Sequence, residues 1–288
     1  MTTTTGTKPA LPSGTFLIGG DMPVARLGFG ALWLTGPGVW GEPADRANAI
    51  RVLRRAVELG VNFIDTADSY GPYVSEELIS EALHPYPDGV VIATKAGQVR
   101  TGPGQWHALG RPEFLRQEVE LSLRRLQLDR IDLFYLHRVD PQVPLADQVG
   151  ALGDMQSEGK IRHIGLSNVT VDQIREAQLE VTVVTVQNRY NPRERTSEPV
   201  LNFCADAGLG FVPWNPLPKS GSTGDAEIDR IAADLGATPH QVALAWLLRR
   251  APVMLPIPGT STLVHLEENI AAASLRLTDE QFATLAEI

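Results

Sequence analysis

Residues 61–71 read V-N-F-I-D-T-A-D-S-Y-G, an apolar run that ends in Asp65 and continues into a polar loop with Tyr70 and Gly71. An apolar run this short, followed by turn residues, is typical of a β-strand that is buried on both faces of a parallel sheet. The carboxyl ends of such strands, and the loops that follow them, carry the chemistry of α/β proteins. The stretch therefore predicts a buried strand with Asp65 and Tyr70 at the functional edge of a sheet.

Two later apolar runs also end in a polar side chain. Residues 90–95 end in Lys95, and residues 131–137 end in His137. A lysine at the end of a buried strand needs an anionic partner or a functional role, because an unpaired charge is costly to bury. His137, taken alone, is explained as well by ordinary core packing. Asp65, taken alone, can be explained as a turn residue. Together, at the ends of parallel strands, these side chains are expected to face one mouth.

Strand-like and helix-like segments alternate along the chain. A helical pattern follows each of eight expected strands, at residues 26–33, 61–65, 90–95, 131–137, 161–167, 183–187, 209–214 and 253–257. Eight such units without a composition break predict one closed barrel. A doubly wound open sheet usually has a Gly-rich phosphate turn after its first strand, and Gly28 and Gly30 are not followed by the third glycine of such a turn. These two glycines indicate close packing inside a barrel.

The predicted architecture is an α/β fold with a single (β/α)8 TIM barrel. We expect residues 1–14 to form a flexible N-terminal lead and residues 15–288 to form the catalytic barrel domain. The barrel is expected to begin with a short β-hairpin, because two apolar runs flank a Gly-Gly-Asp turn at residues 19–21.

The composition of the 288 residues narrows the class of protein. A net charge of −9 leaves no basic surplus for a nucleic-acid backbone or an acidic membrane surface. Cys204 is the single cysteine, so the chain has no internal disulfide and no Cys-based metal cluster. No apolar run approaches the about 20 residues that span a bilayer, and the N-terminus lacks the apolar core of a secretory signal. We expect a cytoplasmic protein, monomeric or weakly self-associating, without a metal and with a small-molecule partner.

Asp65, Tyr70, Lys95 and His137 suit the delivery of a proton to a carbonyl oxygen. A tyrosine with an ordinary pKa near ~10 is a poor acid at neutral pH unless its anion is stabilised. The ammonium of Lys95 is expected to stabilise that anion, and Asp65 to hold the ammonium charged and in place. His137 can orient the carbonyl by a hydrogen bond. The reducing equivalent must come from a cofactor, because no side chain donates hydride.

With these residues identified, the chain from about Arg26 onward resembles the aldo-keto reductase family. The family's tetrad matches Asp65 in F-I-D-T-A, Tyr70 in Y-G, Lys95 in A-T-K and His137 in L-H-R-V-D. The resemblance implies an oxidoreductase with a (β/α)8 barrel that binds NADPH (NADP+) across its mouth. It implies reduction of aldehydes and ketones, with the tyrosine as general acid.

The resemblance also implies a cofactor site. Its residues would be Ser167, Asn168, Gln187, Trp214, Leu217, Lys219, Gly259, Thr260, Ser261, His265, Glu268 and Asn269. The first three would bind the nicotinamide carboxamide, and Trp214 would stack on the nicotinamide ring, where relatives more often have tyrosine. Leu217 and Lys219 would lie beside the pyrophosphate, and the residues from 259 onward would surround the adenosine phosphate and adenine.

One departure from the family concerns the 2′-phosphate of NADPH. Many relatives have a lysine or arginine at residues 259–265, where this chain has only His265 and the hydroxyls of Thr260, Ser261 and Thr262. A helix N-terminus can bind phosphate without a cation, so NADPH stays favoured. NADH remains an alternative cofactor.

The substrate pocket is expected to have aromatic walls, which suit a flat or apolar carbonyl compound. Its residues come from the loops at 36–41 and 102–107 and from neighbouring positions, and they are Trp33, Trp40, Tyr73, Trp106 and Asn215. The loop G-P-G-V-W-G at 36–41 and the segment I-P-G-T-S-T-L-V-H-L-E-E-N at 257–269 are most similar to a bacterial branch that includes pyridoxal reductases. That similarity implies reduction of pyridoxal to pyridoxine.

Two other functions remain open on the sequence. A Schiff-base barrel aldolase would use Lys95 as the nucleophile, but Asp65 beside it would keep the amine protonated. A non-catalytic NADP(H)-binding accessory or redox-sensing module would hold the cofactor with little turnover, as some aldo-keto reductase relatives on membrane channels do. The intact tetrad argues against the second alternative.

Overall fold

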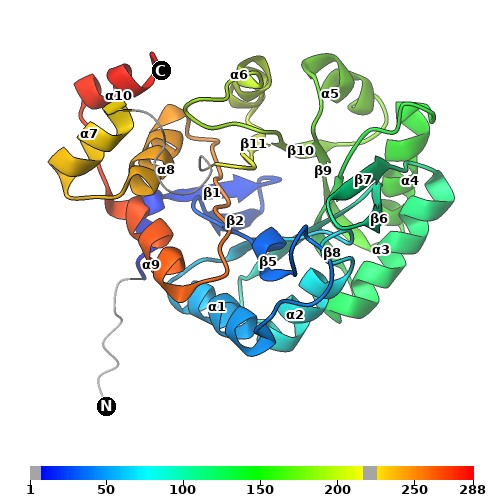
Figure 1. The fold of residues 1–288 in the computed structure, drawn as a ribbon. Coiled ribbons are helices and arrows are strands. Elements are labelled where there is room, and N and C mark those ends of the chain that lie inside the picture. Colours follow the sequence, from blue (N-terminus) through cyan, green and yellow to red (C-terminus); the bar gives the residue numbers. More distant parts are fainter. Residues whose placement is uncertain (1–7, 217–225) are drawn as a thin grey trace.

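Parallel strands curl into a barrel, and helices surround it (Figure 1). The computed structural model describes residues 8–216 and 226–288. Within these residues seven strands hydrogen-bond in the order β11-β10-β9-β8-β5-β4-β3, so the strands of this sheet lie side by side in the order in which they occur in the chain. The strands are β3 (Phe29–Gly30), β4 (Phe63–Asp65), β5 (Val91–Ala96), β8 (Ile131–Leu136), β9 (Ile161–Ser167), β10 (Val183–Gln187) and β11 (Gly210–Phe211).

The eighth position of the barrel is filled by residues 253–258, which close the sheet without forming a regular strand. Leu255 N donates to Phe211 O at 2.8 Å, and on the other side Gly28 N donates to Pro256 O at 2.9 Å. Two prolines in the segment have no N–H to donate, so a continuous ladder cannot form there. The predicted (β/α)8 barrel is confirmed. Its eighth strand is an irregular segment that these hydrogen bonds join to the strands on either side.

Glycine allows the close approach that this closure requires. A Cβ on Gly30 would lie 2.8 Å from Ile257 O, and a Cβ on Gly28 would lie 2.8 Å from a ring carbon of Phe63. Both distances are shorter than a real Cβ tolerates, so the predicted packing role of these two glycines is confirmed.

Helices cover the outside of the barrel, and local capping signals determine where they begin. They are α1 (Arg46–Glu58), α2 (Val74–Leu83), α3 (Pro112–Leu126), α4 (Leu145–Ser157), α5 (Val171–Ala177), α6 (Glu198–Ala207), α7 (Ala226–Leu235), α8 (Pro239–Arg250), α9 (Leu263–Ala271) and α10 (Asp279–Leu285). Asp45 caps α1 by accepting a hydrogen bond from Asn48 N. Capping boxes begin α5, α8 and α10 at Thr170, Thr238 and Thr278.

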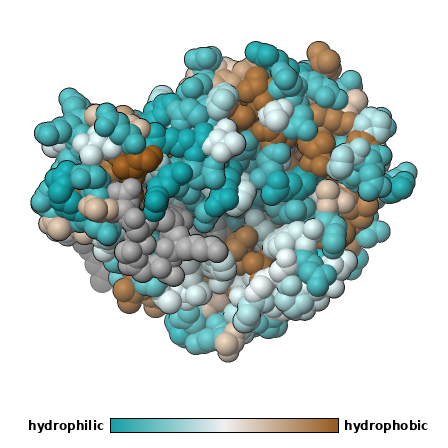
Figure 2. All heavy atoms as spheres, turned by 45° about the horizontal axis from the view of Figure 1, so that its top comes forward, coloured by the Kyte–Doolittle hydropathy of each residue, from teal (hydrophilic) through white to brown (hydrophobic). Residues whose placement is uncertain are grey.

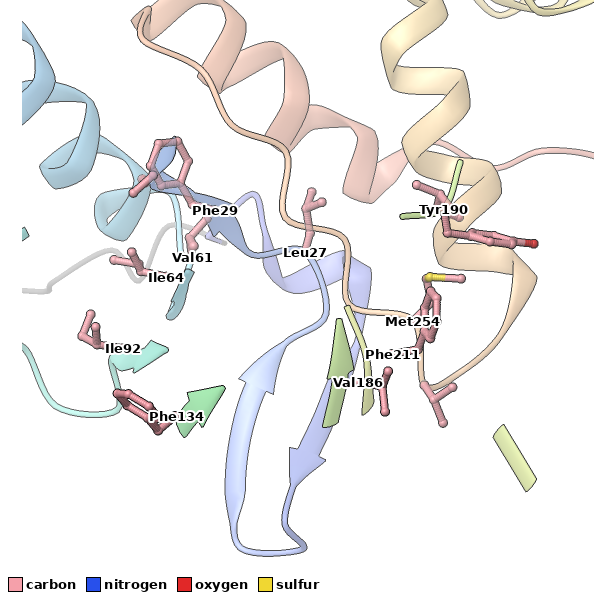
Figure 3. Close-up of a cluster of buried hydrophobic side chains, with 14 of the residues drawn as sticks. Leu27, Phe29, Val61, Ile64, Ile92, Phe134, Val186, Tyr190, Phe211 and Met254 are labelled. Atoms are coloured by element: carbon pink, nitrogen blue, oxygen red, sulfur yellow. The ribbon is translucent and has the colours of Figure 1, made fainter. Parts of the chain in front are cut away.

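Two hydrophobic layers result from this arrangement. Figure 3 shows part of the outer layer, between strands and helices, where Phe29, Ile64, Ile92 and Phe134 lie among other buried apolar side chains. The inner layer fills the barrel, and the predicted hairpin of β1 (Thr15–Ile18) and β2 (Met22–Ala25) contributes to it. Burying each large apolar side chain contributes roughly 1.5–3 kcal/mol, so both layers stabilise the barrel.

The structure differs from the sequence-based prediction in three segments. The first strand is much shorter than residues 26–33, because a 3-10 helix, η2 (Ala31–Leu34), begins directly after β3. Residues 102–107 do not form a simple loop: β6 (Gln98–Gly102) and β7 (Gln105–Ala108) make an antiparallel hairpin. Within the predicted lead, residues 8–14 contain η1 (Leu11–Ser13), and Ala10 is fully buried against the barrel.

None of the helices in the described ranges combines the length and apolar character that crossing a bilayer requires. The face in Figure 2 is mainly hydrophilic, and its hydrophobic side chains form small separate groups.

Candidate active site

The four predicted catalytic residues meet at the carboxyl end of the barrel. Asp65 is the last residue of β4, Lys95 lies near the end of β5, and His137 follows β8 directly. Tyr70 lies on the loop between β4 and α2. All four are at most 7% exposed. The parallel registers of β4, β5 and β8 therefore bring together side chains that are up to 72 positions apart in the chain, from residue 65 to residue 137.

Lys95 and Asp65 form a buried ion pair. Lys95 Nζ donates to Asp65 Oδ2 at 2.7 Å and to Thr66 O at 2.6 Å. The second carboxylate oxygen, Oδ1, accepts a hydrogen bond from Gln187 Nε2 at 2.7 Å. Burial raises the pKa of Asp65 and lowers the pKa of Lys95, and their mutual attraction opposes both shifts. The predicted pairing is present, so the lysine amine is held in one position.

Tyr70 lies beside this ion pair. The Lys95 Nζ atom is 5.1 Å from the centroid of the Tyr70 ring. Burial, together with the negative charges of Asp65 and Asp68, raises the pKa of Tyr70 well above its usual value of 10.0. The sequence predicts that the lysine favours the phenolate, whereas desolvation is the larger effect in the structure. Tyr70 therefore keeps its proton across the neutral pH range.

His137 packs edge-on against Tyr70, with ring centroids 5.8 Å apart and an interplanar angle of 79°. Burial and the nearby charges of Lys95 and Arg138 lower the pKa of His137 well below 6.5, so the imidazole is neutral. Its Nδ1 atom lies 3.3 Å from Ser69 Oγ. In the tautomer in which Ser69 donates to Nδ1, Nε2 carries the proton and can donate to a carbonyl oxygen.

The residues predicted to bind the carboxamide lie next to this group. Asn168, which has a φ of +59°, donates from Nδ2 to Ser167 Oγ at 2.7 Å and to His137 O at 3.3 Å. Its Oδ1 atom accepts a hydrogen bond from Trp214 Nε1 at 2.9 Å. The Oε1 atom of Gln187 accepts no hydrogen bond from the residues that the structure describes. Amide donors and acceptors of this kind suit a primary amide, which both donates and accepts.

The segment predicted to surround the adenosine phosphate forms the start of α9. Thr262 caps this helix by accepting from His265 N at 3.3 Å, and the largely buried Thr260 accepts from Thr262 N at 3.1 Å. Ser261 O accepts a hydrogen bond from Asn48 of α1 at 2.7 Å. Glu268 and Asn269 lie further along α9, and Asn269 is buried. Leu217 and Lys219 lie outside the described residues.

Gly259 comes before this segment and packs tightly. A Cβ there would lie 2.6 Å from Gly30 O and 3.0 Å from Cδ1 of Trp33. Trp33 is 61% exposed, and with Ser261 it lines a cleft of about 210 Å³ beside the start of α1. The structure therefore brings Trp33 to the predicted adenosine segment, whereas the sequence analysis assigned it to the substrate pocket.

Aromatic side chains form a wall beside Tyr70. Trp106, on β7, makes edge contacts with Tyr70 at 6.3 Å and with His137 at 6.5 Å between ring centroids. Trp40 joins the same region, because it pairs with Gly71 next to Tyr70. We call Trp40, Trp106 and the loops that carry them the aromatic wall.

The other two predicted pocket residues lie differently. Asn215 has a φ of +53°, and its backbone oxygen accepts from Asn191 Nδ2 at 3.0 Å. Tyr73 lies under Arg125 of α3, 4.2 Å from the guanidinium carbon to the ring centroid. No ring contact among the described residues joins Tyr73 to Tyr70 or Trp106. The structure does not bring Tyr73 together with the aromatic wall.

Arg100 is a residue that sequence reasoning missed. It lies on β6 and stacks on Trp106, 3.6 Å from the ring centroid. Its five N–H groups donate to backbone oxygens at 2.6 to 3.4 Å, and the acceptors are Gly38, Val39, Ser69, Gly102 and Gln105. Nothing local in the sequence marks this role, because three of the five acceptors come from two other loops. The Pro-Gly pair at 103–104 does indicate the turn of the hairpin.

A barrel with a buried Asp–Lys pair beside a tyrosine and a neutral histidine at its mouth indicates a carbonyl oxidoreductase. A family model described as Aldo/keto reductase family matches residues 26–288. The chain belongs to this family and is an NAD(P)H-dependent oxidoreductase. The predicted family is thereby confirmed.

Individual relatives are similar over almost the whole chain. An uncharacterized oxidoreductase of Schizosaccharomyces pombe is 54% identical over 269 residues, which cover 93% of this chain and 88% of the relative. Pyridoxine 4-dehydrogenase of Escherichia coli is 44% identical over 281 residues, covering 96% and 98%. The crystal structure of an aldo-keto reductase from Klebsiella pneumoniae in complex with NADPH superposes with a TM-score of 0.81 at 28% identity, covering 95% and 94%.

Proposed function

We propose that the protein is an NADPH-dependent reductase of aldehydes or ketones in which Tyr70 is the general acid. The observation that carries this proposal is the buried Lys95–Asp65 ion pair, 2.7 Å between its charged atoms, beside the ring of Tyr70. A buried ion pair contributes little to stability by itself, so its presence at the mouth of a barrel supports a functional role.

The cofactor site is proposed from the hydrogen-bonding groups of this chain. Ser167 Oγ, whose own proton goes to no described residue, and Gln187 Oε1 supply a donor and an acceptor for a carboxamide, and Trp214 supplies a flat surface for the ring next to it. The N-terminus of α9, with the hydroxyls of Thr260 and Ser261, is suited to a phosphate group. NADPH, when bound there, supplies the hydride. The NADPH complex of the Klebsiella pneumoniae structure supports the same cofactor class.

In the proposed mechanism the chain supplies a proton and holds the carbonyl in place. Tyr70 is protonated at neutral pH and donates its hydroxyl proton to the carbonyl oxygen as negative charge develops there. Lys95 stabilises the phenolate that remains, because its ammonium is fixed beside the ring by Asp65. Neutral His137 donates a hydrogen bond that orients the same oxygen.

We propose aromatic aldehydes as the substrate class, with pyridoxal as the first candidate. Trp106 and Trp40 offer flat apolar surfaces beside Tyr70, and such surfaces favour planar rings. The relative named pyridoxine 4-dehydrogenase supports the pyridoxal candidate. A cytoplasmic location and a monomeric or weakly associating state remain predictions from the sequence.

The proposal is tested by titrating the protein with NADPH and with NADH, using tryptophan fluorescence. The oxidation of the bound cofactor is then followed by its absorbance with pyridoxal and with 4-nitrobenzaldehyde. We expect NADPH to bind more tightly than NADH, and at least one aldehyde to be reduced. Tight NADPH binding without oxidation by any of a panel of aldehydes and ketones would contradict a reductase and favour the accessory module.

A further inference from the structure

Two arginines near Tyr70 differ in how their guanidinium groups are used. All five N–H groups of Arg100 donate to backbone oxygens, so this cation has no donor left for a ligand. Arg138 follows His137 directly at the mouth of the barrel. It makes no hydrogen bond and no ion pair with any residue that the structure describes. One guanidinium is therefore structural, and the other has no partner among residues 8–216 and 226–288.

The charge of Arg138 acts on the two residues proposed to contact the carbonyl. Its positive charge favours the ionised form of Tyr70 and opposes protonation of His137, the residue that directly precedes it at the end of β8. Its backbone oxygen packs against Gly97, 3.3 Å from where a Cβ would lie. The side chain is half-buried, and burial lowers the pKa of Arg138, yet a guanidinium stays charged at neutral pH.

Among the described residues no acidic side chain at the mouth pairs with this cation: the raised pKa of the buried Asp68, beside Tyr70, favours its neutral form. Asp65 is already paired with Lys95. Both carboxylate oxygens of Asp140 accept backbone N–H groups, one from Gly110 and one from Gln142, each at 2.9 Å. A partly desolvated cation without a counter-ion is unfavourable, so a ligand anion at this position would be stabilised.

We propose that Arg138 binds an anionic oxygen of the substrate, so that the preferred substrates are aldehydes or ketones that carry a carboxylate or an ionised hydroxyl group. A guanidinium suits such oxygens because its planar fork can donate two parallel hydrogen bonds. The aromatic wall holds the ring of such a substrate, Tyr70 and His137 hold its carbonyl, and Arg138 holds its anionic group. This inference rests on the proposed reductase function.

The kinetic test uses two aldehydes of nearly the same shape that differ in charge, 4-carboxybenzaldehyde and 4-nitrobenzaldehyde. The readout is the ratio of their kcat/KM values. Differences in intrinsic reactivity cancel when this ratio is compared between the wild type and a variant. We expect Arg138→Met to reduce the preference for the carboxylate roughly 10- to 100-fold, mainly through KM, because a hydrogen bond between charged partners is lost. Arg138→Lys should retain part of the preference.

The matched control is Arg130→Met. Arg130 is exposed and precedes β8 at the opposite end of the barrel, whereas Arg138 follows the same strand. We expect this variant to keep the wild-type ratio. If Arg138→Met lowers kcat/KM equally for the charged and the uncharged member of this pair and of the pair described next, Arg138 acts on Tyr70 or on the cofactor, and the proposal is overturned. An increase in the Kd of NADPH with an unchanged ratio would overturn it as well.

A second pair of aldehydes separates the two kinds of anion. Pyridoxal carries an ionisable ring hydroxyl, and 4-pyridinecarboxaldehyde lacks one. If Arg138→Met removes a preference for pyridoxal over 4-pyridinecarboxaldehyde, recognition of an ionised hydroxyl is supported. If the substitution reduces only the preference for 4-carboxybenzaldehyde over 4-nitrobenzaldehyde, recognition of a carboxylate is supported. If neither pair responds to the substitution, the inference is wrong.

A binding measurement separates this inference from the proposed function. Calorimetry with benzoate and the NADP+-loaded protein needs no turnover. If no aldehyde is reduced but benzoate binds the wild type at least 10-fold more tightly than Arg138→Met, the anion site is supported and the reductase proposal fails. If aldehydes are reduced and Arg138→Met binds benzoate as tightly as the wild type does, the reductase proposal stands and the recognition of a carboxylate by Arg138 is overturned.

Discussion

At the scale of single residues, the central feature is how the environment of each tetrad member sets its protonation state. Tyr70 stays protonated and His137 stays neutral because both are buried, while Lys95 and Asp65 are held against each other at 2.7 Å. A protonated Tyr70 can donate a proton, and a neutral His137 can orient a carbonyl oxygen. The Lys95–Asp65 ion pair can stabilise the charge that develops.

Replacing Tyr70 with phenylalanine removes the proton donor and little else. The hydroxyl makes no hydrogen bond to any described residue, so the ring contacts with Trp106 and His137 persist. We expect kcat for aldehyde reduction to fall roughly 10²- to 10⁴-fold, the usual contribution of a general acid. The Kd of NADPH, measured by fluorescence, should stay within about twofold because the carboxamide residues are unaffected.

Tyr86→Phe is the control for that experiment. Tyr86 donates to Leu126 O at 2.7 Å, away from the mouth, and its loss should affect stability and leave kcat unchanged. Turnover by Tyr70→Phe at the wild-type rate would rule out Tyr70 as the acid.

At the scale of elements, the hairpin of β6 and β7 is positioned by a single side chain. Arg100 joins the hairpin to residues 38–39 and to Ser69, and it stacks on Trp106. The aromatic wall therefore depends on one guanidinium that connects three segments. Its five donors in a fixed plane explain why arginine stands here, because lysine has three donors on a flexible stem.

Arg100→Met should loosen the aromatic wall without unfolding the barrel. We expect kcat/KM for aldehydes to fall roughly 10- to 100-fold, since small displacements of positioning groups are costly, while NADPH binding is retained. Hydrogen exchange should increase at residues 36–41 and 98–108. Arg100→Lys keeps the charge but not the five bonds, so full activity of the lysine variant would show that charge alone matters.

A second charged group joins α2, β5 and α3. Glu76 is fully buried and accepts a hydrogen bond from Thr94 Oγ1 at 2.6 Å. It also forms an ion pair with Arg125 at 2.5 Å. Arg125 in turn lies 3.5 Å from the buried Glu118. Arg125→Met leaves two buried carboxylates without their cation. We expect the free energy of unfolding to fall by about 3–5 kcal/mol in denaturant titrations.

The double variant Arg125→Met with Glu76→Gln provides the comparison for this network. Removing one of the two uncompensated charges should recover part of the lost stability. Equal unfolding midpoints for the single and double variants would mean that the ion pair does not stabilise the packing of α2 on α3.

The elements also show which signals in the sequence are sufficient by themselves. The starts of α1, α5, α8 and α10 are marked in the sequence itself, because a capping side chain and the first turn it binds are adjacent in the chain. The β6–β7 hairpin was not predicted, since its strands are largely polar and its position depends on Arg100 and distant loops. The eighth strand was predicted from its apolar run, but its prolines prevent a regular ladder.

At the scale of the whole molecule, one buried carboxyl group should be visible in the pH dependence of stability. Asp68 is 2% exposed, and its Oδ1 atom has no hydrogen-bond partner in the described residues. Burial, with the nearby charges of Glu76 and Glu118, raises the pKa of Asp68 well above 3.8. In the unfolded chain the group ionises at its ordinary pKa, so the unfolded state releases its proton first as pH rises.

The direction of the pH effect on stability follows from this difference between the folded and unfolded pKa values of Asp68. The contribution of Asp68 to stability is fully present below the unfolded pKa of 3.8 and is lost progressively as pH rises through the folded pKa. Asp68→Asn does not titrate. We therefore expect the melting temperature of the variant, relative to wild type, to increase from pH 4 to pH 8. A difference that is constant over this range would contradict the raised pKa of Asp68.

The sequence by itself determined the barrel, the helix starts and the four residues at the strand ends, because these depend on local signals: hydrophobic period, caps, and polar residues that end buried runs. Only the tertiary structure decided how those residues are used. Asp65 binds Lys95, 30 positions away, and Gln187, 122 positions away, and no local pattern specifies such pairs. Arg100 has every donor occupied, whereas Arg138 has none occupied by a residue that the structure describes. This difference likewise arises from contacts that exist only once the loops of the barrel come together.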